Sequence, residues 1–106
     1  MAPYLATQGI DMAASTFLEI VLRSDEFTFD GRDEIEDPLD EALADSSLGE
    51  VTGGGSGIEG SNIDVEVSDL SRGLGLVKRV LRELNVGPST VVNQYEPRKI
   101  VHQVYD

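Results

Sequence analysis

The sequence of this 106-residue chain predicts a single α+β domain. Two stretches repeat apolar residues three and four positions apart, as amphipathic helices do, and several shorter stretches alternate apolar and polar residues, as strands do. Their order along the chain is strand, helix, strand, strand, helix, strand, followed by one last extended piece. The chain has no cysteine, which excludes disulfide bonds and thiolate metal sites.

The beginning of the chain differs from the rest. Residues 1–15 show no periodic pattern, so we expect a flexible N-terminal extension there and the α+β domain at residues 16–106. The first strand is expected at residues 16–23, with both faces partly apolar, which favours a central position in a sheet. Its core face would hold Leu18, Ile20 and Leu22, and its other face Phe17, Glu19 and Val21.

The first helix is expected at residues 38–47. Pro38 suits a first helical turn, because that turn needs no backbone donor, and Asp37 would then be the N-cap. Ile35 shares the helical spacing of the apolar residues that follow, so a loose turn beginning at Asp33 remains open.

A glycine-rich stretch follows this helix. We expect a short strand at residues 50–52, then a loop that either turns a hairpin through a wide turn or bulge or adapts to a partner. The next strand, residues 61–68, alternates strictly, with three core-facing residues and three polar ones. The expected loop comprises Gly53, Gly54, Gly55, Ser56 and Gly57, the core-facing residues are Ile63, Val65 and Val67, and the polar residues are Asn62, Asp64 and Glu66.

The second helix has the strongest periodic pattern. Its apolar stripe runs from Leu70 to Leu84, with either Asp69 or Ser71 as the N-cap and a stop at residues 87–88. A strand is expected at residues 90–95, and residues 100–105 form another short strand or an extended tail.

This element order over residues 16–96 resembles the ferredoxin-like βαββαβ fold. The resemblance implies an antiparallel sheet with two helices on one face, its first and third strands side by side at the centre, plus an extra C-terminal extended segment. It carries no activity with it. The sheet face away from the helices, called the open face below, would then hold the candidate interaction residues Phe17, Glu19, Val21, Asn62, Asp64 and Glu66.

Residues 53–67 also resemble, over a short stretch, the polymerase-beta-type nucleotidyltransferases, in which Gly-Ser precedes a strand with two carboxylates separated by one residue. The resemblance implies that Gly55 and Ser56 approach a triphosphate and that Asp64 and Glu66 hold magnesium. The spacer is shorter than that family's and no basic residue flanks the phosphate position. The other reading is that Asp64 and Glu66 form the solvent-facing half of an alternating strand.

The charge of the chain narrows the classes of partner. The net charge is −12, with −15 over residues 1–70 and +3 over residues 71–106. Such an acidic chain repels nucleic acid and anionic membranes and favours basic proteins. This charge predicts that the chain has no nucleic-acid partner. No apolar run is long enough to span a bilayer, so we also expect a cytoplasmic protein without a membrane partner.

We therefore favour a small acidic protein-interaction module without a cofactor over an enzyme. It would be either an inhibitor or immunity-type protein that masks a basic partner, or a homo-oligomeric binding domain such as a dimer. The alternative is a metal-dependent nucleotidyltransferase-like enzyme that uses Asp64 and Glu66.

Overall fold

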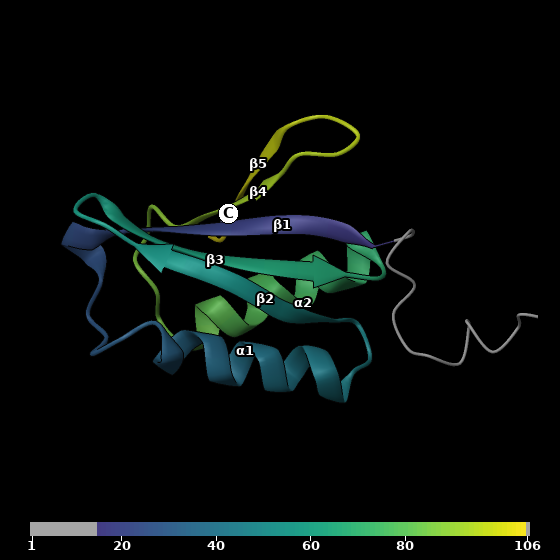
Figure 1. Cartoon of the computed structure of the whole chain (residues 1–106), viewed down its shortest axis with the longest axis horizontal. Helices are drawn as coiled ribbons and strands as arrows, with labels where there is room; N and C mark the ends of the chain where they lie inside the picture. The colour runs from purple at the N-terminus through teal and green to yellow at the C-terminus, as the bar shows by residue number, and fades with distance from the viewer. Residues whose placement is uncertain (1–14, 106) are drawn as a thin grey trace, which may run out of the picture.

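The computed structural model describes residues 15–105, and it confirms the α+β class (Figure 1). The extension expected at residues 1–15 lies outside the described residues except for Ser15, and the first strand begins at Thr16. In chain order the helices and strands are β1 (Thr16–Arg23), a 3-10 turn (Ser24–Glu26), α1 (Asp33–Asp45), β2 (Gly49–Ser56), β3 (Gly60–Val67), α2 (Leu70–Glu83), β4 (Val91–Gln94) and β5 (Ile100–Gln103).

The five strands form one antiparallel sheet in the order β2-β3-β1-β4-β5. Both helices lie on the same side of this sheet, and the β4–β5 hairpin forms the end of the sheet opposite β2, away from α1 (Figure 1). The arrangement is loosely compatible with the expected ferredoxin-like order, and differs from a four-stranded sheet because β5 is added beside β4. The last extended piece is therefore a paired strand.

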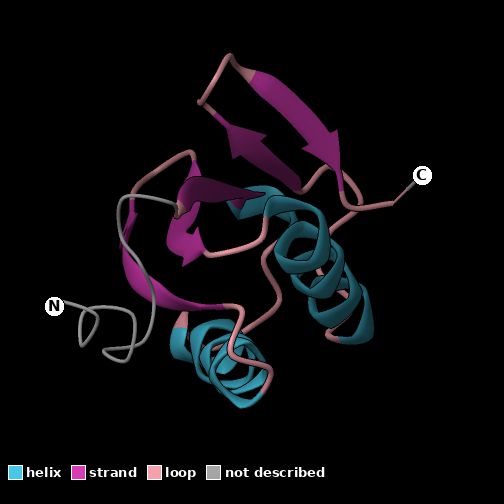
Figure 2. Ribbon diagram, turned by 90° about the vertical axis from the view of Figure 1, so that its right-hand side faces the viewer, coloured by secondary structure: helices cyan, strands magenta, loops and turns pink. Residues whose placement is uncertain are grey.

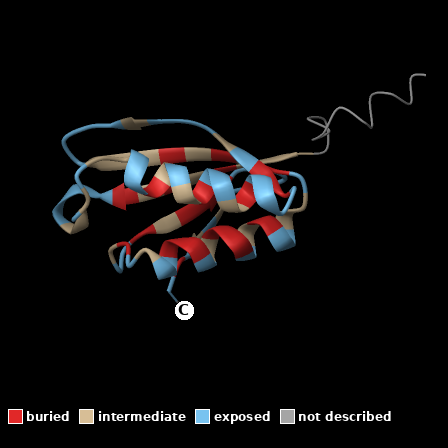
Figure 3. Cartoon of the chain, turned by 90° about the horizontal axis from the view of Figure 1, so that it is seen from below, coloured by how far each residue is buried: buried red, intermediate tan, exposed pale blue. Residues whose placement is uncertain are grey.

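The core lies between the sheet and the two helices (Figure 2). The alternation expected for β1 and β3 is confirmed, since Leu18, Ile20, Ile63, Val65 and Val67 are all fully buried. Seen from the helix side, buried stretches run along both helices, with exposed residues on their outer surfaces (Figure 3). Burying this apolar surface is the main favourable contribution to folding.

Helix α1 begins five residues earlier than expected, at Asp33, so Asp37 is not its N-cap. Ile35 is fully buried together with Leu39 and Leu43, and these three residues are four positions apart. The packing of Ile35 therefore makes the first turn part of the helix. Pro38 lies inside α1, where it removes one backbone donor from the helix.

The expectation of a glycine loop is wrong for Gly53, Gly54, Gly55 and Ser56, because these residues belong to the edge strand β2. They pair with β3 from Gly53 opposite Asp64 to Ser56 opposite Ser61, after a register shift between Val51 and Gly53. A Cβ atom on Gly54 would stand 2.6 Å from the backbone oxygen of Asn62, so this position has no room for a side chain. Of the five expected loop residues, only Gly57 lies in the turn that joins the two strands, where its amide donates to the Gly60 carbonyl.

Helix α2 follows the expected bounds closely. Asp69 is the N-cap, and its carboxylate accepts a hydrogen bond of 3.0 Å from the Arg72 amide. Within residues 15–105, no helix combines the length and the hydrophobicity that crossing a membrane requires.

Candidate functional site

The structure brings the six candidate interaction residues together on the open face. They form three directly opposed pairs between the neighbouring strands β1 and β3, and all six are half-buried. Their orientation follows from strand alternation, because their neighbours in sequence face the helices. The opposed pairs are Phe17 with Glu66, Glu19 with Asp64, and Val21 with Asn62.

The carboxylates of this face interact with neutral donors. The Asn62 amide donates to Asp64 at 3.0 Å, and the Ser15 hydroxyl donates to Glu66 at 2.9 Å. In the part of the chain that the structure describes, no three His, Cys, Asp or Glu side chains are grouped so that they could hold a metal ion. Asp64 and Glu66 share one face of β3 with Glu19 opposite Asp64, but these three carboxylates do not form such a group.

Two further residues meet the candidate residues on the open face: Asn93 in β4, and Tyr95 just after it. The sequence pattern did not predict either of these contacts. Tyr95 stacks on Phe17, with ring centroids 6.0 Å apart and an interplanar angle of 26°. Asn93 lies opposite Glu19 in the β1–β4 pair, and its amide nitrogen is 3.4 Å from Oε1 of Glu19. Alternation in β4 puts Asn93 on this face, but only the pairing of β4 with β1 brings it and Tyr95 to Glu19 and Phe17.

Glu19 accepts hydrogen bonds from both Tyr95 and Asn93. The Tyr95 hydroxyl donates to Oε1 of Glu19 at 2.5 Å, the same oxygen that Asn93 approaches. This hydrogen bond stabilises the protonated phenol and, with the burial of the hydroxyl and the nearby negative charge, raises the pKa of Tyr95 above its usual value of 10.0. The phenol ring is therefore held at two points, by Phe17 and by the Glu19 carboxylate.

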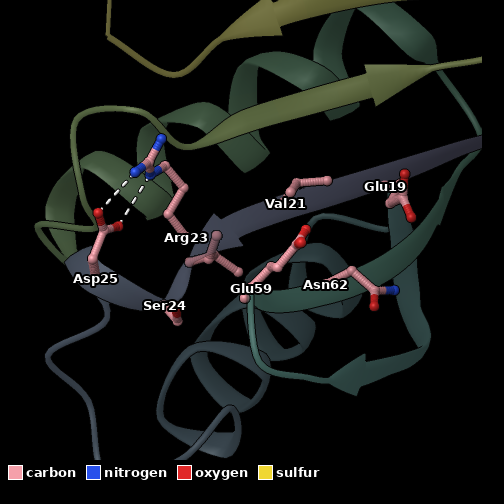
Figure 4. Close-up of a pocket in the computed structure, with 9 residues that line it drawn as sticks. Glu19, Val21, Arg23, Ser24, Asp25, Glu59 and Asn62 are labelled. Carbon is pink, nitrogen blue, oxygen red and sulfur yellow. Dashed lines mark hydrogen bonds and ion pairs between the residues drawn. The ribbon is translucent and has the colours of Figure 1, made fainter.

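A hollow of about 690 Å³ opens on the same face, at the end of β1 and the start of β3 (Figure 4). Three acidic side chains line it, Glu19, Asp25 and Glu59, together with one basic side chain, Arg23. Arg23 forms an ion pair with Asp25 at 2.7 Å, which Figure 4 marks with dashed lines. The other residues that line the hollow are Val21, Leu22, Ser24, Gly60 and Asn62.

Half of the candidate interaction residues, Glu19, Val21 and Asn62, thus border the hollow, while Phe17 contributes to the aromatic stack. The arrangement combines an exposed aromatic ring with carboxylates on one surface. Such a surface can attract and hold cationic groups.

No protein-family model, no curated protein and no solved structure matches this chain.

Proposed function

We propose that this chain is an acidic, non-enzymatic protein-interaction module, built as a ferredoxin-like sheet with one added strand, and that its open face binds a basic protein. The observation that carries the proposal is the grouping of Glu19, Asp64 and Glu66 beside the Phe17–Tyr95 stack on a face that neither helix covers. The net charge of −12 supports a basic partner.

The inhibitor or immunity-type role fits this proposal, because an acidic face can mask a basic active site or nucleic-acid-binding surface. Complementary charge would mainly accelerate association, and this effect weakens as ionic strength rises. One observation bears on the nucleotidyltransferase alternative: Arg32 donates from Nη1 to the Ser56 hydroxyl at 3.2 Å, so a basic residue does lie beside the position proposed for the triphosphate. Arg32 is also paired with Glu36 at 3.1 Å, which already balances its charge.

The test compares three versions of this 106-residue chain as immobilised baits in lysate of the source cell. They are the wild type, an open-face variant with Asp64→Asn and Glu66→Gln, and a control variant with Glu34→Gln and Glu41→Gln. The control removes the same charge from exposed positions on α1. Captured proteins are identified by mass spectrometry, and association rates of the purified partner are measured at several salt concentrations.

We expect a basic protein that the wild type and the α1 control retain and that the open-face variant loses. Its association rate should fall as salt rises. The same captured proteins on all three baits, or an association rate that salt does not change, would contradict the proposal.

A further inference from the structure

The Tyr95 ring forms a fixed platform on the open face. Its hydroxyl is held by Glu19, its ring lies against Phe17, and the residue is still 38% exposed. A carboxylate therefore lies at the rim of an accessible aromatic ring. This combination suits a cation, which interacts with the ring face and with the negative charge at the same time.

The chain already places a cation at this ring. The Nζ atom of Lys99 lies 5.6 Å from the centroid of Tyr95, within the distance at which cations are attracted to aromatic rings. Lys99 comes from the other end of the segment that joins β4 to β5. The position over the ring thus accepts a basic side chain, and Lys99 is its occupant within the chain.

The acidic hollow begins beside this ring, because Glu19 belongs to both. At the far end of the hollow, Arg23 is engaged with Asp25, whereas Glu59 adds a further negative charge to the lining. Between Glu19 and Arg23, β1 advances four residues, or roughly 13 Å. An extended segment lying along β1 could therefore place one side chain over Tyr95 and a second one in the hollow.

We infer that the open face recognises an extended, arginine-bearing segment of the partner, with an arginine side chain replacing Lys99 over the Tyr95 ring. The inference rests on the proposed function and adds the chemistry that the face selects. A guanidinium group is planar, so it can stack on the ring while it donates to the Glu19 carboxylate. A lysine ammonium is a compact point charge and cannot do both equally well.

The role of Lys99 follows from the same geometry. A partner's arginine and Lys99 compete for the ring, so Lys99 weakens binding until it is displaced. Removing Lys99 should therefore strengthen binding of the partner's arginine more than removing a positive charge elsewhere on the chain does.

The experiment uses fluorescein-labelled octa-arginine and octa-lysine peptides as probes, with binding to the full chain measured by fluorescence anisotropy at two salt concentrations. We expect octa-arginine to bind more tightly than octa-lysine by about two- to five-fold. Tyr95→Leu should remove this preference, whereas Tyr95→Phe, which keeps the ring, should retain most of it. Circular dichroism checks that each variant is folded.

Two further variants test the role of Lys99. Lys99→Gln should raise the affinity for octa-arginine by about two- to five-fold more than Arg79→Gln does. Arg79 is a matched control, because it is an exposed base on α2 that pairs only loosely with Glu83, at 4.0 Å.

Equal affinity for the two peptides, or an arginine preference that survives Tyr95→Leu, would overturn the inference. In that case, if the Asp64→Asn, Glu66→Gln variant binds both peptides more weakly than the wild type does, the proposed function stands and only the arginine site is refuted. If that variant also binds both peptides as the wild type does, the open face is not the binding surface and the proposed function fails as well.

Discussion

The contact between α2 and β3 predicts opposite effects for the same substitution at two glycines of one helix. Gly73 is buried, and a Cβ atom there would stand 2.6 Å from Cβ and 2.7 Å from Cγ1 of Val67. Gly75 is exposed, and a Cβ atom there would meet nothing within 4 Å. Gly73→Ala and Gly75→Ala therefore differ in their tertiary contacts while sharing the same change in helix propensity.

The magnitudes follow from two opposing effects. Alanine is favoured over glycine inside a helix by about 1 kcal/mol, and Gly75→Ala should raise the free energy of unfolding by about that amount. At Gly73 the same gain is opposed by overpacking, which costs about 1–3 kcal/mol. Val67 is fully buried and its Cβ cannot rotate away, so α2 must shift from the sheet. The net result for Gly73→Ala should be a loss of about 1 kcal/mol.

Urea unfolding followed by far-UV circular dichroism measures both effects. The midpoint should rise for Gly75→Ala and fall for Gly73→Ala, each by roughly 0.5 M, with the slope unchanged. In thermal unfolding, each change corresponds to a shift of roughly 4–8 °C. A Gly73→Ala variant as stable as Gly75→Ala would refute the close packing of α2 on β3.

Three further predictions concern individual side chains. Burial and the positive charge of Lys78 lower the pKa of His102, so an NMR titration should give a value below 6.5. As the pH falls, His102 is therefore protonated in the unfolded chain before it is protonated in the folded one, so the free energy of unfolding decreases below about pH 6.5. His102→Gln should make the free energy of unfolding less dependent on pH in this range. The pKa of Tyr95 is raised, so an ultraviolet titration of its phenol should have its midpoint above 10.0, and Glu19→Gln should lower that midpoint. Because the folded state holds the phenol proton to higher pH than the unfolded state does, the stability gained from the Tyr95–Glu19 hydrogen bond is lost as the pH rises above about 10. Asp69→Ala removes the N-cap acceptor of α2 and should lower the free energy of unfolding by about 1 kcal/mol, whereas Asp69→Asn should keep most of it.

Local pattern was sufficient for β1, β3 and α2, in each of which one face meets the core. The alternation of Leu18, Ile20 and Leu22 in β1 predicted the buried face, and therefore also placed Glu19 and Val21 on the open face. Strand geometry alone determines this division, since successive side chains point to opposite sides. The same reasoning located α2, whose apolar stripe repeats with helical spacing.

Local pattern failed where the deciding contact comes from elsewhere in the chain. The glycines around Gly54 suggested a turn, yet they form an edge strand because β3 pairs with them and leaves Gly54 no room for a side chain. Pro38 suggested a helix start, yet the burial of Ile35 extends α1 by more than a turn toward the N-terminus. In both cases tertiary packing outweighed a residue's usual preference.

The amino-acid sequence by itself determined the α+β class, the acidic character and the six residues of the open face, because periodicity and charge are properties of neighbouring residues. Only the tertiary structure decided that β4 pairs with β1, and with it the meeting of Tyr95 with Phe17 and Glu19. Tyr95 is more than seventy positions from Phe17 and Glu19 in the sequence. The local spacing of residues does not determine which strands become neighbours. The cation-binding surface proposed here depends on that pairing.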